Sequence, residues 1–150
     1  MYLIEQLQPE EFPQCNNIWN MEHNHKLAEQ FYAQLLAKNR ITFVCKGERG
    51  FVGEISLVLD MNDKDYTIPG QRIYLSRLLV KKDYRRQGIG TALSNHVFQY
   101  AKKLGYTEMS LGVDLDNFSA LKLYSALGFT NIILIDKDNQ GEYVKLLKYL

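Results

Sequence analysis

Several short stretches of the chain carry the hydrophobic pattern of β-strands, either alternation with polar residues or a brief apolar run bounded by turn residues. They lie at residues 2–7, 41–46, 51–59, 72–81, 109–113, 129–135 and 143–149. A turn at Gly47–Gly50 separates the second stretch from the third, and a turn at Asp138–Gly141 separates the last two. Both pairs are therefore predicted to form β-hairpins.

Apolar residues recur at helical spacing in four other segments. One begins at Pro9, two cover residues 26–38 and 88–104, and the last runs from Asn117 to Leu127. The combined order is strand, helix, helix, strand, strand, strand, helix, strand, helix, strand, strand. This order predicts an α/β fold with a mixed, mostly antiparallel sheet and helices on both faces.

The overall composition excludes several classes of protein. A length of 150 residues with 46% hydrophobic and 23% charged residues is that of an ordinary globular chain, so we expect one domain over residues 1–150. The formal net charge of +1 predicts no binding to nucleic acid or membrane through overall charge. Glu5 and Pro9 come too early for a signal peptide, and no run approaches the roughly 18 apolar residues of a membrane helix, so a cytoplasmic protein is expected.

Cysteine and histidine suggest no metal site. Cys15 and Cys45 lie in apolar segments without zinc-ligand spacing, and we expect both to be buried free thiols. The three histidines lack a paired carboxylate spacing. No metal is therefore expected.

The stretch LLVKKDYRRQGIGTAL, residues 78–93, has the order of a phosphate-binding site. A buried strand is followed by a basic loop and a helix that starts inside a glycine pair. The first amides of a helix have no internal partner, and glycine leaves room for an anion. Residues 72–86 carry a net charge of +5, which suits a pyrophosphate. The competing interpretation is a glycine-softened helix start with solvated basic residues.

Two known phosphate loops do not fit this stretch. The G-x-x-x-x-G-K-[ST] loop is absent because the chain has no Gly-Lys pair, and Leu93 replaces the third glycine of G-x-G-x-x-G. Arg85-x-x-Gly88-x-Gly90 instead resembles the [RQ]-x-x-G-x-[GA] signature of the GCN5-related N-acetyltransferases (GNAT). The segment from Asn117 to Phe129 also resembles the family's N-x-x-A-x-x-x-Y-x-x-x-G-F pattern. The resemblance covers about residues 41–136 through these motifs and the first forty residues only through the order of helices.

The resemblance implies a GNAT fold with splayed central strands and acetyl-CoA as cosubstrate. The pyrophosphate would lie on the amides of Arg85–Thr91. The pantetheine arm would lie along the strand that ends at Leu78–Val80. Asn117 and Tyr124, which share one helix face, would point toward the coenzyme. The implied coenzyme-binding residues are Leu78, Leu79, Val80, Arg85, Arg86, Gln87, Gly88, Ile89, Gly90, Thr91, Asn117, Ala120 and Tyr124.

Two of these residues have a further interpretation. Tyr124 is the expected catalytic acid, since a departing thiolate needs a proton donor. A helix N-cap would equally account for Asn117, and a core aromatic for Tyr124.

The base that deprotonates the amine is less evident. Many family members carry a glutamate where this chain has Ser76. We therefore expect Glu54, on the neighbouring strand, to act as the catalytic base, with Asp114 and Asp116 as second choices. A solvated strand glutamate is the alternative for Glu54.

Other residues point to the acceptor. Residues 54–65 have a net charge of −3, and Asp60, Asp63 and Asp65 could form an acidic edge that attracts a cationic amine, or simply a solvated loop. The aromatic side chains of the first helices, Trp19, Phe31 and Tyr32, are expected in the core, with part of the set lining an acceptor pocket.

The expected function is transfer of an acetyl group from acetyl-CoA to a primary amine of a small molecule or peptide, by direct attack in a ternary complex. Two alternatives are open: a protein N-terminal acetyltransferase of the ribosomal-protein type, and a coenzyme-A-binding regulatory module without turnover. A homodimer is compatible with the resemblance. The acceptor itself does not follow from the sequence.

Overall fold

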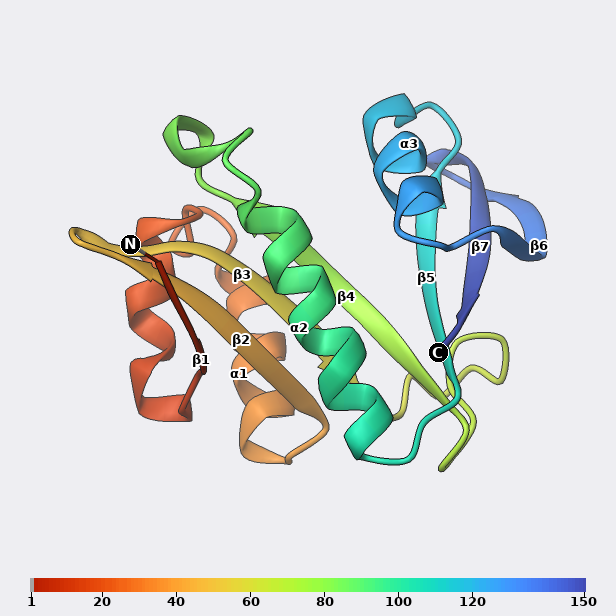
Figure 1. The fold of residues 1–150 in the computed structure, drawn as a ribbon, viewed down its shortest axis with the longest axis horizontal. Coiled ribbons are helices and arrows are strands. Elements are labelled where there is room, and N and C mark those ends of the chain that lie inside the picture. Colours follow the sequence, from red (N-terminus) through yellow and green to blue (C-terminus); the bar gives the residue numbers. More distant parts are fainter. Residues whose placement is uncertain (1) are drawn as a thin grey trace. The chain divides into compact units, whose positions relative to one another are not determined.

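The structure is a computed structural model that describes residues 2–150. Its elements, in chain order, are β1 (Leu3–Gln6), the 3₁₀ helix η1 (Pro9–Asn17), α1 (His25–Leu36), β2 (Arg40–Gly47), β3 (Gly50–Val58), β4 (Arg72–Val80), the 3₁₀ turn η2 (Lys82–Tyr84), α2 (Ile89–Lys103), β5 (Glu108–Asp114), α3 (Phe118–Ala126), β6 (Asn131–Asp138) and β7 (Gly141–Tyr149) (Figure 1). Apart from η2, this is the order that the hydrophobic pattern predicts.

The strands form a seven-stranded sheet in the order β1-β2-β3-β4-β5-β7-β6. The pairs β1–β2, β2–β3, β5–β7 and β6–β7 are antiparallel, and β4–β5 is parallel. Both predicted hairpins are present, closed by Gly47 opposite Gly50 and by Asp138 opposite Gly141. The predicted mixed, mostly antiparallel sheet is therefore confirmed.

The parallel ladder between β4 and β5 is short. It pairs Arg72 with Glu108 and ends at Tyr74 with Ser110, although β4 continues to Val80 and β5 to Asp114. Within β4, Arg77 has φ +61°, a conformation that a regular strand does not contain. This residue therefore locally breaks the extended geometry of β4 after the ladder has ended.

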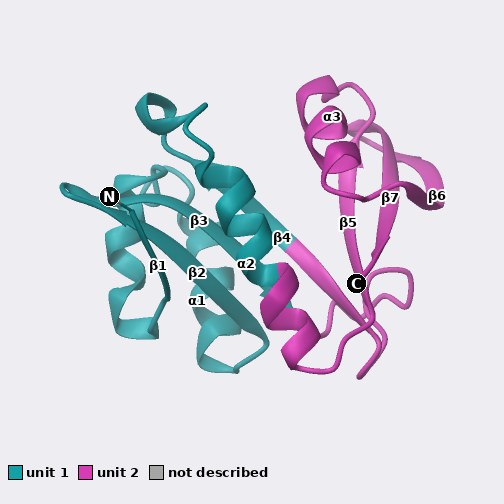
Figure 2. Ribbon diagram, viewed as in Figure 1, with its two compact units in different colours: residues 1–58, 76–97 teal, residues 59–75, 98–150 magenta. Residues whose placement is uncertain are grey.

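The chain divides into two compact units (Figure 2). One comprises the chain up to Val58 together with Ser76–Val97, and the other comprises Leu59–Leu75 with Phe98–Leu150. A single domain over residues 1–150 stays a prediction.

In the first unit, helices lie on both faces of the strands (Figure 1). On one face, side chains of η1 and α1 such as Cys15 and Phe31 pack in one buried cluster with Val44 of β2. On the other face, a side chain at Gly53 would lie 3.1 Å from Leu93 of α2. Glycine at position 53 therefore allows α2 to approach the sheet closely.

In the second unit, the first four residues of β5 are all buried, and burial alternates only toward the end of the strand. Leu111 and Val113 are buried, whereas Gly112 and Asp114 are exposed. Phe129, which follows α3, is buried and packs against the Phe98 ring at 6.0 Å between centroids. At this end of β5 one face thus belongs to the core, and the other, at Gly112 and Asp114, is open to solvent.

The first predicted helix differs in type from the expectation, because Pro9–Asn17 is a 3₁₀ helix. Pro13 lies inside it and has no N–H to donate to a preceding carbonyl, which disfavours a continuous α-helix. Cys15 and Cys45 are free and buried, as expected. Within residues 2–150, no helix is long and apolar enough to cross a membrane, and no group of three His, Cys, Asp or Glu residues could hold a metal ion.

Candidate functional site

The glycine loop ends in a helix start with open amides. The first backbone hydrogen bond into α2 runs from the Ala92 amide to the Gly88 carbonyl at 2.9 Å, so the amides of residues 88–91 precede the helical ladder. Gly88 has φ +82°, and no heavy atom lies within 4 Å of the place its side chain would take. The helix start therefore combines partial positive charge with free space, which is what a phosphate needs.

Basic and polar side chains surround this helix start. Arg85, Arg86 and Gln87 are exposed, and the Arg85 Nε donates to the Val80 carbonyl at 2.9 Å. The Tyr2 hydroxyl donates to Gln87 Oε1 at 2.6 Å, which ties the loop to the N-terminal segment. Open space, amides and arginines together fit a pyrophosphate.

The end of β4 packs against the same helix start. A side chain at Gly90 would lie 3.8 Å from Val80 and 3.9 Å from Leu78. Leu78, Leu79 and Val80 are half-buried, and they lie beyond the last pair of the ladder with β5. This placement suits an extended chain that adds to β4, as the family resemblance implies for the pantetheine arm.

Asn117 caps the helix of the second motif. Its side-chain oxygen accepts a hydrogen bond from the Ala120 amide at 3.2 Å, and α3 begins at the next residue. The N-cap interpretation of Asn117 is therefore confirmed. Contact of Asn117 or Ala120 with the coenzyme stays a prediction.

Tyr124, on α3, lies against the aromatic core of the second unit. Its ring meets the Phe129 ring edge-on at 5.8 Å between centroids. Burial, with a smaller effect of nearby Tyr74, raises the pKa of Tyr124 to about 12. The phenol therefore keeps its proton over the ordinary pH range, and the raised pKa makes it a weaker acid than an exposed tyrosine.

Glu54 is not a solvated strand residue, so that alternative is wrong. Its side chain is 2% exposed and accepts a hydrogen bond from Trp19 Nε1 at 2.6 Å. Burial raises the pKa of Glu54, against the opposing effects of Arg77, Trp19 and Arg40. The Arg77 guanidinium in turn lies 4.2 Å from the centroid of the Trp19 ring. A catalytic role for Glu54 stays a prediction.

The acidic edge is partly neutralised, which corrects the expectation for two of its members. Asp63 and Asp65 both pair with Lys145 Nζ, at 3.1 and 3.0 Å. Asp63 also belongs to a pocket of about 290 Å³ whose other lining residues are Tyr66, Tyr74, Gly112, Val113, Asp114, Asp138, Tyr143 and Lys145. Apart from Asp63 and Asp114, none of these was a sequence candidate, because no local motif joins a loop tyrosine to a lysine some 80 residues later.

The family comparison agrees with the motifs. The family model described as "Acetyltransferase (GNAT) family" matches residues 1–129. Human N-acetyltransferase 8 is 36% identical over 88 residues, which are 58% of this chain and 37% of that protein. The match thus spans little more than a third of that relative.

Solved structures share the fold. The ribosomal-protein-S18-alanine N-acetyltransferase of Escherichia coli has a TM-score of 0.77 at 21% identity, over 99% of this chain and 94% of that one. An aminoglycoside 6′-N-acetyltransferase complexed with coenzyme A has a TM-score of 0.75 at 15% identity, over 98% and 96%. With the family model covering most of its length, the chain belongs to the acetyltransferase (GNAT) family.

Proposed function

We propose that the protein is an N-acetyltransferase that moves an acetyl group from acetyl-CoA to a primary amine. The observation that carries the proposal is the open start of α2, where the amides of residues 88–91 precede the helical ladder beside an unobstructed Gly88. Family membership supports the same donor. The aminoglycoside 6′-N-acetyltransferase described above is complexed with coenzyme A, and that ligand agrees with the proposed donor.

The proposed coenzyme site uses backbone more than side chains. The amides of residues 88–91 would bind the pyrophosphate, and exposed Arg85 and Arg86 would add positive charge. The edge of β4 from Leu78 to Val80 would pair with the amide groups of the pantetheine arm.

The proposed reaction is a direct transfer in a ternary complex. The lone pair of the neutral amine attacks the thioester carbonyl, and a C–N bond forms as the carbonyl oxygen takes the negative charge. The C–S bond then breaks as the oxyanion re-forms the carbonyl, and the leaving thiolate takes the proton of Tyr124. The attacking nitrogen, which became cationic when the C–N bond formed, loses a proton, and this proton restores the Tyr124 phenol. Since Cys15 and Cys45 are both buried and burial raises the pKa of each thiol, neither is suited to form an acetyl-enzyme.

The amine must lose a proton before it attacks. An amine with a pKa of about 10.4 is almost entirely protonated at neutral pH, which costs roughly 4–5 kcal/mol. We propose Glu54 as the acceptor of that proton, because its raised pKa makes its carboxylate a stronger base than an exposed glutamate. Asp114, which is exposed, is the alternative.

The experiment is release of the coenzyme thiol from acetyl-CoA with a panel of small amines and peptides that have free N-termini. Turnover with small amines supports the proposal in its first form, and turnover with peptides alone supports the N-terminal alternative. Coenzyme binding without turnover on any acceptor identifies a regulatory module instead.

A further inference from the structure

We propose that the pocket between the 59–71 loop and strands β5 and β7 selects acceptors with a second positive charge, that is, diamines and longer polyamines. The inference rests on the proposed function, because it names the acceptor class of that acetyltransferase. All residues of the pocket belong to the second unit.

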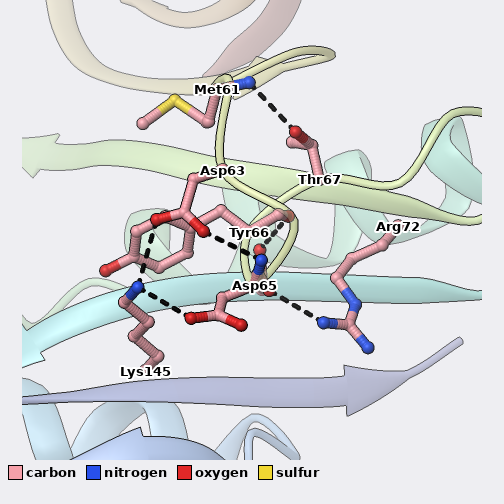
Figure 3. Close-up of polar contacts among 8 residues, drawn as sticks. Met61, Asp63, Asp65, Tyr66, Thr67, Arg72 and Lys145 are labelled. Atoms are coloured by element: carbon pink, nitrogen blue, oxygen red, sulfur yellow. Dashed lines mark hydrogen bonds and ion pairs between the residues drawn. The ribbon is translucent and has the colours of Figure 1, made fainter.

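The pocket is built by an internal ion-pair clamp (Figure 3). Lys145 of β7 is 7% exposed, and its ammonium binds the carboxylates of Asp63 and Asp65. The same ammonium lies 4.7 Å from the centroid of the Tyr66 ring. Arg72 donates to the Asp65 carbonyl at 2.8 Å, so both ends of this loop segment are held to neighbouring strands.

Tyr66 lines the pocket, and contacts with β5 fix its position. Ser110 of β5 donates to the Tyr66 carbonyl at 2.5 Å. The Tyr66 hydroxyl lies only 2.5 Å from the place that a side chain at position 112 would occupy. Gly112 therefore makes room for the hydroxyl that faces this part of β5.

The charges of the pocket are not balanced. Three aspartates (Asp63, Asp114 and Asp138) and one lysine (Lys145) line the pocket, which gives its lining a net charge of −2 at neutral pH. Lys145 is already shared between Asp63 and Asp65, and no ion-pair partner for Asp114 or Asp138 occurs among the described residues. Asp138 Oδ1 accepts a hydrogen bond from the Gln140 amide at 2.8 Å, so its second oxygen and the Asp114 carboxylate are the groups available for a cation that the chain does not supply.

Aromatic rings add to this preference for a cation. Tyr66, Tyr74 and Tyr143 all line the pocket, and the Tyr66 and Tyr74 rings meet at 4.7 Å between centroids. Ring faces attract ammonium groups, and carboxylates bind them by charge-assisted hydrogen bonds. The same chemistry already holds Lys145 against Tyr66.

Tyr74 joins the pocket to the proposed acid. It lines the pocket, and it lies near enough to Tyr124 to contribute to that residue's raised pKa. In the proposed complex, one nitrogen of the acceptor is neutral and receives the acetyl group, while a second nitrogen stays charged beside the carboxylates of Asp114 and Asp138. A monoamine has no group for the second position.

The test compares α,ω-diamines with monoamines of the same chain length, such as 1,4-diaminobutane with butylamine. We expect kcat/KM to be at least about tenfold higher for the diamine, the typical effect of one charge-assisted contact. Asp114→Asn and Asp138→Asn should each reduce this ratio severalfold. Asp136→Asn, an exposed aspartate of the same strand as Asp138 that does not line the pocket, should keep it.

A second readout separates this inference from the proposed function. Binding of 1,4-diaminobutane to the coenzyme-free protein is followed by NMR shifts of residues in β5 and β7. Binding that Asp114→Asn weakens supports the pocket even if no acetyl group is transferred, in which case only the proposed function fails. Equal kcat/KM for both amines, a ratio unchanged in both variants, or turnover restricted to peptides would overturn the inference.

Discussion

Removal of the Lys145 ammonium should cost less stability than removal of the charges that bind it. The Lys145 side chain is 9% exposed, whereas those of Asp63 and Asp65 are 37% and 42% exposed. In Lys145→Met the two carboxylates become hydrated by water. The free energy of unfolding should then fall by the contribution of two partly exposed ion pairs, about 1–2 kcal/mol in total. In the double variant Asp63→Asn, Asp65→Asn the ammonium stays buried with only neutral partners, and we expect a loss of about 2–4 kcal/mol.

The assay is equilibrium unfolding in urea at pH 7 for the wild type and both variants. Asparagine at position 63 keeps the side-chain oxygen that accepts the Asp65 amide at 2.9 Å, so the turn itself should survive. Asp114→Asn, which removes an exposed carboxylate without an ion-pair partner among the described residues, should stay within about 0.5 kcal/mol of the wild type. A loss in Lys145→Met equal to or larger than that in the double variant would refute this reasoning.

The pH dependence of the same clamp has a defined sign. The pKa of Asp63 is lowered, first by the Asp65 amide and, against the effect of burial, also by Lys145. Its contribution is therefore complete above the ordinary aspartate pKa near 3.8 and disappears as the pH falls through the lower folded value. The difference in unfolding free energy between wild type and Lys145→Met should shrink in that acidic range and be constant from pH 5 to 8.

Three further predictions concern the reaction. Gly88→Glu places a carboxylate where the pyrophosphate should bind, so acetyl-CoA affinity measured by calorimetry should fall at least tenfold; some stability is lost as well, because φ +82° disfavours any side chain even in open space. Unchanged affinity would exclude this cradle. Tyr124→Phe should lower kcat by about 10²–10⁴ with a nearly constant KM for acetyl-CoA. Since the pKa of Tyr124 is about 12, its deprotonation should cause no decline of kcat below about pH 10. A kcat of Tyr124→Phe within threefold of wild type at saturating substrate would remove Tyr124 from the mechanism. Glu54→Gln should lower kcat/KM most at neutral pH and less near the pKa of the amine, and a pH-independent loss would mean that Glu54 only supports Trp19.

The elements and the glycine loop could be predicted because their signals are local. The hydrophobic period changes at the start of α2, and Gly88 and Gly90 stand beside the arginines in a single stretch. The glycine that ends the hairpin turn at position 141 and the cap at Asn117 are likewise read within a few residues. In each case the interacting groups are neighbours in the chain.

The pocket could not be predicted, because its parts come from distant segments. Lys145 meets Asp63 across 82 positions, and Trp19 meets Glu54 across 35. The acidic loop therefore showed an excess of negative charge in the sequence, whereas the structure pairs two of its carboxylates with one lysine. The burial of Glu54 could not be predicted for the same reason. Its hydrogen-bond partner, Trp19, follows the end of η1 and does not lie on a neighbouring strand.

The most direct test of the proposed activity uses acetyl-CoA with an isotopic label in the acetyl group and follows the label by mass spectrometry of the products and of the protein. With 1,4-diaminobutane or another amine of the panel, we predict labelled N-acetylamine formed in equal amount with free coenzyme A, no label on the intact protein, and loss of product formation in Gly88→Glu. Label on the protein before it reaches the amine, or labelled product at an unchanged rate in Gly88→Glu, would contradict direct transfer from a coenzyme bound at the start of α2.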